Sequence, residues 1–103
     1  MDSLSRQKII LTRSDNGLAG KINPSCEHCH VLLDTSAGAF TVTLPDAQGT
    51  MQREFIFKNI DPTTAATIIP QNGQYIDNIQ TKTVAALASL SLWPDQVRTW
   101  WVI

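Results

Sequence analysis

Residues 40–44 read Phe-Thr-Val-Thr-Leu, and residues 54–58 read Glu-Phe-Ile-Phe-Lys. In the first stretch apolar and polar side chains alternate, and in the second a phenylalanine recurs at every second position. Both patterns put the larger apolar residues on one face of an extended strand. Pro45 ends the first stretch, because proline has no N–H to give to a neighbouring strand. The two stretches therefore predict short β-strands, each with one buried face.

The same two-residue period recurs on both sides of these stretches, with turn residues roughly every 8–12 positions, which is typical of a sandwich or barrel. Asn72-Gly73 is suited to a tight turn, because both residues tolerate a positive φ. Residues 83–93 fit either a helix or a strand, and their neighbourhood favours a strand. We expect an all-β fold, a mainly antiparallel β-sandwich or barrel of short strands. The expected core residues are Phe40, Val42, Leu44, Phe55, Phe57, Ile69, Ile76, Leu90, Leu92, Trp100 and Val102.

The charge of the chain is low and unevenly placed. Charged residues make up 17% of the 103 residues, against about 25% in an ordinary soluble domain. Such a charge-poor surface suggests that a partner or further copies of the chain cover part of it. The net charge of −1 argues against a nucleic-acid partner.

Residues 1–25 carry four basic and two acidic side chains, whereas residues 26–103 carry four basic and seven acidic ones. We therefore expect an extended N-terminal arm over 1–25 that docks on an acidic protein surface through Arg6, Lys8 and Arg13, and a β-sandwich domain over 26–103.

No run of residues is long and apolar enough for a membrane span, and residues 1–6 do not resemble an export signal. These features predict assembly in a reducing cytoplasm without a membrane partner. Cys26 and Cys29 would then remain thiols unless they bind a metal ion.

Residues 26–30, Cys-Glu-His-Cys-His, match the short pattern of covalent haem attachment. No helical pattern follows them, which argues against haem. A redox pair needs a turn at 27–28, because residues i and i+3 of a strand lie about 10 Å apart and face opposite sides. His28 and His30 would share one face of a strand, so three copies around a threefold axis could supply imidazoles to one metal ion. The remaining reading is structural, with Cys29 packed as a small apolar side chain.

Three tryptophans lie close to the end of the sequence. Trp100 and Trp101 are adjacent and must face opposite sides of a strand, so one is expected in the core and the other at an interface. Trp93 and Trp101 are the expected interface residues, and a platform for a surface glycan is the alternative. No catalytic motif is found, and the sequence predicts neither an enzyme nor a bound cofactor.

Residues 31–45, Val-Leu-Leu-Asp-Thr-Ser-Ala-Gly-Ala-Phe-Thr-Val-Thr-Leu-Pro, resemble a recurring pattern of β-domains in virion proteins of tailed bacteriophages. The similarity continues through Glu-Phe-Ile-Phe-Lys-Asn at 54–59, the Ile-Pro to Ile-Asp step at 68–77 and the closing Trp-Val-Ile at 101–103. It covers residues 28–103. The segment from Cys26 to His30 is not part of the pattern.

The resemblance implies a non-enzymatic structural role in a phage virion, as a tail-fibre, head-fibre or capsid-decoration component. Domains of this kind are commonly homotrimers, and their partners are other virion proteins such as the major capsid or tail proteins. The length of the sequence favours a decorating or adaptor protein over a complete receptor-binding fibre. A metal- or redox-active module built on residues 26–30 remains the alternative.

Overall fold

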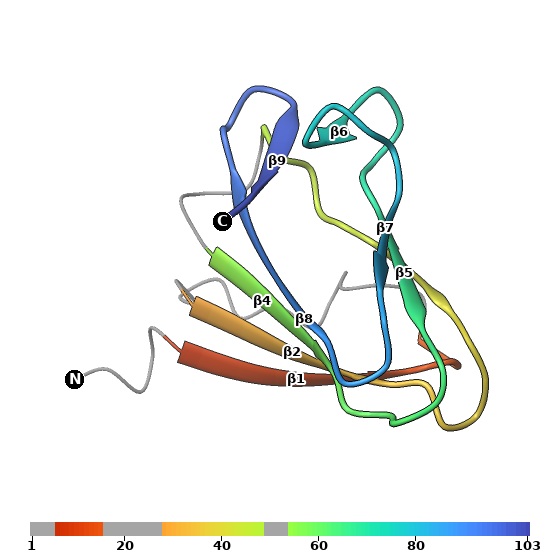
Figure 1. The fold of residues 1–103 in the computed structure, drawn as a ribbon. Helices are drawn as coiled ribbons and strands as arrows, with labels where there is room; N and C mark the ends of the chain where they lie inside the picture. The colour runs from red at the N-terminus through yellow and green to blue at the C-terminus, as the bar shows by residue number, and fades with distance from the viewer. Residues whose placement is uncertain (1–5, 16–27, 49–53) are drawn as a thin grey trace.

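The computed structural model describes residues 6–15, 28–48 and 54–103, and these ranges contain nine β-strands in two sheets (Figure 1). No helix in these ranges is long and apolar enough to cross a membrane. The six-stranded sheet has the order β1-β2-β4-β8-β9-β6, and the three-stranded sheet has the order β3-β5-β7. The strands are β1 (Arg6–Thr12), β2 (His28–Asp34), β3 (Thr41–Thr43), β4 (Glu54–Asn59), β5 (Ala66–Ile69), β6 (Tyr75–Ile76), β7 (Lys82–Val84), β8 (Ser89–Pro94) and β9 (Thr99–Val102).

The all-β prediction is confirmed, and the fold is sandwich-like, but the sheets are mixed rather than mainly antiparallel. Of the seven strand pairings among the described residues, four are parallel: β1–β2, β2–β4, β3–β5 and β6–β9. The chain order accounts for two of these pairs, β2–β4 and β3–β5. From β2 to β8 each successive strand lies in the other sheet. The strand next in the same sheet therefore runs in the same direction in most pairs, whereas a hairpin would reverse it.

The core lies between the two sheets and is built from the inward-facing half of each strand. In β2 and β4 every second residue is buried, as the period-two pattern predicts. Phe55 packs edge-on against Trp100, with ring centroids 5.4 Å apart, and lies 6.2 Å from Phe57. Ile68 of β5 and Val84 of β7 close the core from the smaller sheet.

A buried polar cluster fastens the end of β4 to its surroundings. The Asn59 side chain is fully buried. Its Nδ2 donates to the carbonyls of Thr64 (2.7 Å) and Val84 (3.2 Å), and its Oδ1 accepts from the backbone N–H of Asp61 (3.0 Å). The Thr35 hydroxyl donates to Thr64 O at 2.7 Å. Each of these buried polar groups thus has a partner, as a stable interior requires.

Eight of the eleven expected core residues are buried, and Phe40, Ile69 and Val102 are only partly buried. Ile68 faces the core while its neighbour Ile69 is only half-buried, because two adjacent apolar residues leave the inward position of a strand ambiguous. Phe40 and Val102 are partly buried and pack against the core.

Residues 83–93 contain two strands instead of one. Residues 85–88 form a turn closed by Ala88 N donating to Ala85 O at 2.9 Å, with Leu87 at φ 60°. The expected strand character is confirmed, but an Ala-Ala-Leu-Ala turn carries none of the usual turn residues.

Part of the expected N-terminal arm belongs to the sheet. Ile9 and Leu11 of β1 are buried in the core, and β1 pairs along its whole length with β2. Residues 1–5 and 16–25 of that arm lie outside the described residues.

Candidate interaction surface

The face of the six-stranded sheet that points away from the smaller sheet, here called the outer face, is the surface on which most of the predicted interface residues meet. Strand register places Lys8, His30 and Ile56 side by side on β1, β2 and β4, and Ser91 of β8 continues the row beside Ile56. The row ends at Ile103, whose N–H donates to Ser91 O at 3.0 Å.

Two tryptophans form the largest apolar element of the outer face. Trp93 and Trp101 are directly opposite each other on the antiparallel strands β8 and β9. They are 37% and 39% exposed, whereas Trp100 between them in sequence is fully buried. The expectation that Trp100 lies in the core and Trp101 does not is therefore confirmed. Ile103, 64% exposed, extends the apolar area beyond the end of β9, whereas Ile10, 49% exposed, lies on β1, with β2 and β4 between it and the tryptophans.

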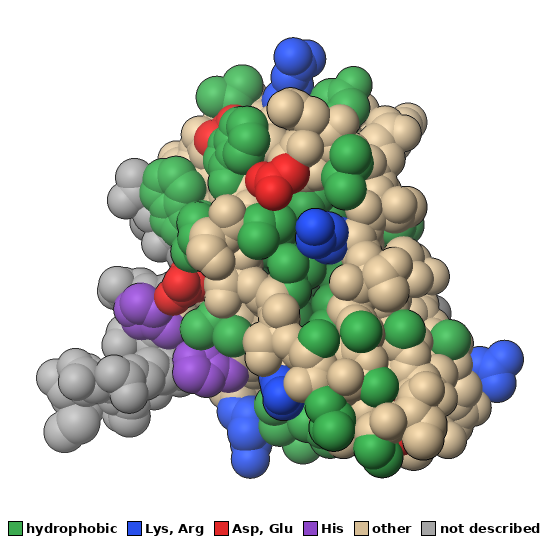
Figure 2. Space-filling model, viewed as in Figure 1, with side chains coloured by type: hydrophobic (Ala, Val, Ile, Leu, Met, Phe, Trp, Pro, Cys, Tyr) green, Lys and Arg blue, Asp and Glu red, His purple; other side chains and the backbone are tan. Residues whose placement is uncertain are grey.

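The two histidines lie on the same face, beside these apolar residues. Both are exposed, and Figure 2 shows them next to each other with an acidic side chain beside them. His28 Nδ1 lies 3.2 Å from Glu54 Oε1, across the β2–β4 pair. Phe55 of β4 pairs with Leu92 of the antiparallel strand β8. One position further along this pair of strands, Glu54 lies beside Trp93. The imidazole–carboxylate pair therefore adjoins the tryptophan pair.

The structure separates Cys29 from the two histidines of the expected metal cluster. Cys29 is buried on the opposite face of β2 from His28 and His30, and it is disulfide-bonded. The expectation of a free thiol is therefore wrong for Cys29. Cys26 lies outside the described residues.

Within 6–15, 28–48 and 54–103, no group of three or more His, Cys, Asp or Glu side chains is placed to hold a metal ion. A metal shared by several copies through His28 and His30 stays a prediction.

The three basic residues of the expected docking arm are in different places. Lys8 is exposed on the outer face. Arg6 is the first residue of β1. Arg13 lies beyond the end of β1, and its Nη1 donates to Ala37 O at 3.3 Å. Only Lys8 thus shares the surface with the exposed tryptophans among the described side chains.

The sequence prediction missed the other apolar members of this surface, namely Ile10, Leu32, Ile56 and Ile103. A signal was present, since 31–33 and 55–57 are apolar at every position. Such runs indicate strands that are covered on both faces.

Among the described carboxylates, three have a lowered pKa, and all three bind the backbone or side chains of turns. The pKa of Asp95 is lowered by hydrogen bonds from the backbone N–H groups of Thr99, Val97 and Arg98. The pKa of Asp61 is lowered chiefly by the N–H of Thr63, and that of Asp34 by the hydroxyl and N–H of Ser36. These groups stabilise turns rather than form an acid–base pair.

Comparison of the chain with protein-family models, curated proteins and solved structures found no match.

Proposed function

We propose that this protein is a non-enzymatic structural component of a tailed-bacteriophage virion, a homotrimeric capsid-decorating, head-fibre or tail-adaptor protein. The observation that carries the proposal is the exposed, directly opposed Trp93–Trp101 pair on the outer face. The sequence pattern over residues 28–103 supports the virion role. The outer face, rather than an arm over 1–25, is the assembly surface in this proposal.

The exposed apolar area is large enough to matter for assembly. With each tryptophan nearly two-fifths exposed, covering the pair removes roughly 100 Å² per side chain from water. At about 25 cal/mol per Å², this gives about 2.5 kcal/mol for each tryptophan. Ile103, two residues after Trp101, adds to this area.

Further copies of the same chain are the occupant that fits the charges best. The outer face carries Lys8 and Lys58 against Glu54, with His28 and His30 beside them. A surface with few charges of both signs can meet its own copy without strong like-charge repulsion. A strongly acidic or basic partner would find little to pair with on this face.

The experiment is a mass measurement in solution by light scattering or native mass spectrometry. The wild-type protein should have three times the 11.4-kDa mass of one chain, and Trp101→Glu and Trp93→Glu should each shift it to the monomer. Val97→Glu is the matched control, because Val97 is 65% exposed and lies in the turn between β8 and β9 rather than in a strand of the sheet. A wild-type protein that remains monomeric at high concentration would refute the assembly proposal.

The virion role has its own test. Mass spectrometry of purified phage particles should find this chain as a stoichiometric component, and cryo-electron reconstruction should place copies in contact through Trp93 and Trp101. Particles that lack the chain would contradict the virion role while leaving the oligomeric state untouched.

A further inference from the structure

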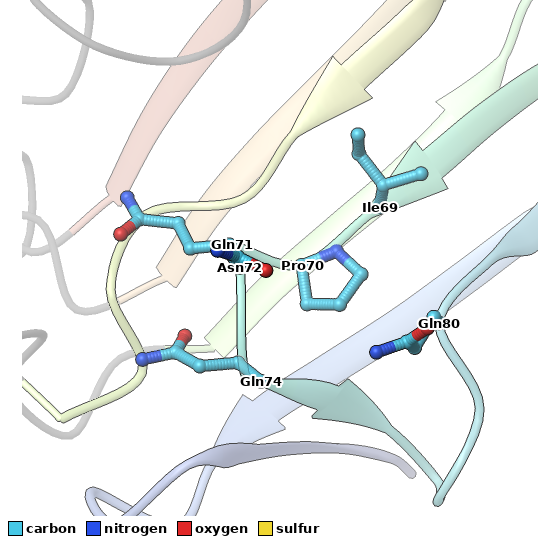
Figure 3. A pocket seen from close by; sticks show the side chains of 6 residues that line it. All are labelled: Ile69, Pro70, Gln71, Asn72, Gln74 and Gln80. Atoms are coloured by element: carbon cyan, nitrogen blue, oxygen red, sulfur yellow. The ribbon is translucent and has the colours of Figure 1, made fainter.

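Asn72 and Gly73 lie in the exposed turn that joins β5 to β6, which Figure 3 shows from close by. Gln74 N donates to Gln71 O at 2.9 Å, and Gly73 has φ 84°, so the turn is of the type that needs a glycine at its third position. The backbone conformation therefore favours a glycine directly after Asn72. This arrangement places the side-chain amide of an asparagine next to the backbone nitrogen of a glycine, two groups that can react with each other.

Both reacting groups are open to water. Among the described residues, no hydrogen bond is made by the side-chain amide of Asn72 or by the N–H of Gly73. Beyond the immediate chain neighbours, a Cβ on Gly73 would meet nothing within 4 Å. Asn72 also lines a groove of about 200 Å³, which is much larger than a water molecule. Neither bonding nor crowding therefore protects this pair of groups.

Asn78 is the closest structural counterpart of Asn72 and differs at the nitrogen that follows it. Asn78 is exposed and lies in a tight turn, with φ 70°. The N–H of Ile79 donates to Ile76 O at 2.8 Å, and the branched side chain of Ile79 crowds the same nitrogen. An attack by this nitrogen on the Asn78 amide would first have to break a hydrogen bond.

Asn59 is protected more completely. Its side chain is fully buried, and its Nδ2 donates to two backbone carbonyls. The N–H of Ile60, which follows it, donates to Leu33 O at 3.0 Å. Of the asparagines at 59, 72 and 78, the three that the structure describes, only Asn72 precedes a nitrogen that is neither hydrogen-bonded nor crowded by a side chain.

We infer that Asn72 is a site of spontaneous deamidation through a cyclic imide. The nitrogen of Gly73 loses its proton to hydroxide and attacks Cγ of Asn72. A new C–N bond closes a five-membered ring, the bond from Cγ to the side-chain nitrogen breaks, and that nitrogen leaves as ammonia. Water then opens the ring at either carbonyl. One opening gives aspartate, and the other gives isoaspartate, in which the backbone runs through the former side chain.

Either product changes the turn. Aspartate adds a negative charge to a turn that has no charged side chain at 71–74. Isoaspartate also lengthens the backbone between Gln71 and Gln74, whose carbonyl and N–H close the turn. The Gln74 side chain accepts a hydrogen bond from Ala47 N (3.0 Å) and donates one to Asp46 Oδ1 (2.6 Å). The modification therefore loosens the contact between this turn and the segment that follows β3.

The test is incubation of the folded protein at pH 8, followed by tryptic digestion and tandem mass spectrometry. Residues 59–82 form one tryptic peptide with all three described asparagines, so their conversions are compared in the same molecules. Asn72 should convert at least about tenfold faster than Asn78, because the hydrogen bond and the branched side chain of Ile79 both raise the barrier. The rate should rise from pH 7 to pH 9, since the attacking nitrogen has to lose a proton. The Asn-Gly pair at 16–17 lies outside the described residues and falls in another peptide.

Two variants separate the structure of the turn from the dipeptide alone. Ile79→Gly makes a second Asn-Gly pair whose nitrogen can keep its bond to Ile76 O, so Asn78 should still convert more slowly than Asn72. Asn72→Gln should abolish conversion at position 72, because the larger ring forms far more slowly. The inference is overturned if Asn72 stays unmodified, if Asn78 or Asn59 converts as fast in the wild-type protein, if Asn78 matches Asn72 in Ile79→Gly, or if the rate does not rise with pH.

The modification is independent of the proposed assembly. Residues 70–74 belong to no strand of either sheet, and the conversion is measured after digestion. A monomeric and a trimeric protein should give the same result, so the two proposals can fail separately.

Discussion

Removing the side chain of Asn59 should be one of the most damaging single changes outside the apolar core. In Asn59→Ala, the carbonyl of Val84 and the N–H of Asp61 lose a buried partner, because both bind the Asn59 amide. The carbonyl of Thr64 keeps the hydroxyl of Thr35. Each buried group left without a partner costs about 1–3 kcal/mol. The free energy of unfolding should therefore fall by about 2–5 kcal/mol, a large part of the 5–15 kcal/mol typical of a domain.

The assay is urea unfolding followed by tryptophan fluorescence, which reports on the buried Trp100. It has to be done at one protein concentration, since assembly also contributes to stability. Asn72→Ala is the matched control, because Asn72 is exposed in a turn, and it should change the stability by less than about 0.5 kcal/mol. If Asn59→Ala lies equally close to wild type, the buried amide is not what fastens β4 to its surroundings.

Asn59→Asp separates hydrogen bonding from shape. A carboxylate keeps the acceptor but has no donor for the carbonyls of Thr64 and Val84, and burial among carbonyls raises the pKa of such a group. The folded variant then binds a proton more tightly than the unfolded chain, so its deficit relative to wild type should shrink as the pH falls. A deficit that does not change with pH would show that the carboxyl group reaches solvent.

Three further predictions concern the core, the turns and acid. Trp100→Phe should lower the free energy of unfolding by about 2–3 kcal/mol, because it removes buried volume and the Nε1 bond to Pro45 O of 3.3 Å; a loss below about 1 kcal/mol would contradict this packing. Gly73→Ala should cost about 1–2 kcal/mol, since φ is 84° there and the added Cβ meets nothing within 4 Å; Gly73→Asn, which tolerates this φ, should cost less. The lowered pKa values of Asp34, Asp61 and Asp95 give stability that is present above the unfolded-state pKa near 4 and is lost as the pH falls below it. A variant with all three changed to Asn should lose less stability between pH 5 and pH 2, and an unchanged acid profile would exclude these groups as its cause.

The sequence contains enough information to identify the strands and most of the core. In β2, β4 and β8 the inward residues alternate as expected, because the side-chain period of two follows from the backbone alone. The sequence is less informative about Ile68 and Ile69, because two adjacent apolar residues fit either face of a strand. It also does not indicate the turn at 85–88, in which Leu87 has a left-handed backbone conformation. Neither feature has a local sequence signal.

Strand pairing is the part of the fold that local pattern could not supply. A period of two shows which side chains point inward but not which strand lies alongside. Because successive strands from β2 to β8 lie in opposite sheets, neighbours within a sheet are far apart in sequence, and their direction depends on long-range packing. For the candidate surface, the sequence indicated Trp93, Trp101 and Lys8 as interface residues. Only the register shows that they share one face.

The parallel pairing also bears on the outer face. Strands that run parallel are usually covered on both faces, and β1, β2 and β4 form a parallel set. Their inner face is covered by the chain itself, through residues such as Val31 and Phe57. Their outer face presents Ile10, half-buried Ile56 and, on the adjoining strands, the tryptophan pair. The strand arrangement and the side-chain pattern therefore favour the same conclusion, that a second layer supplied by another chain completes this sheet.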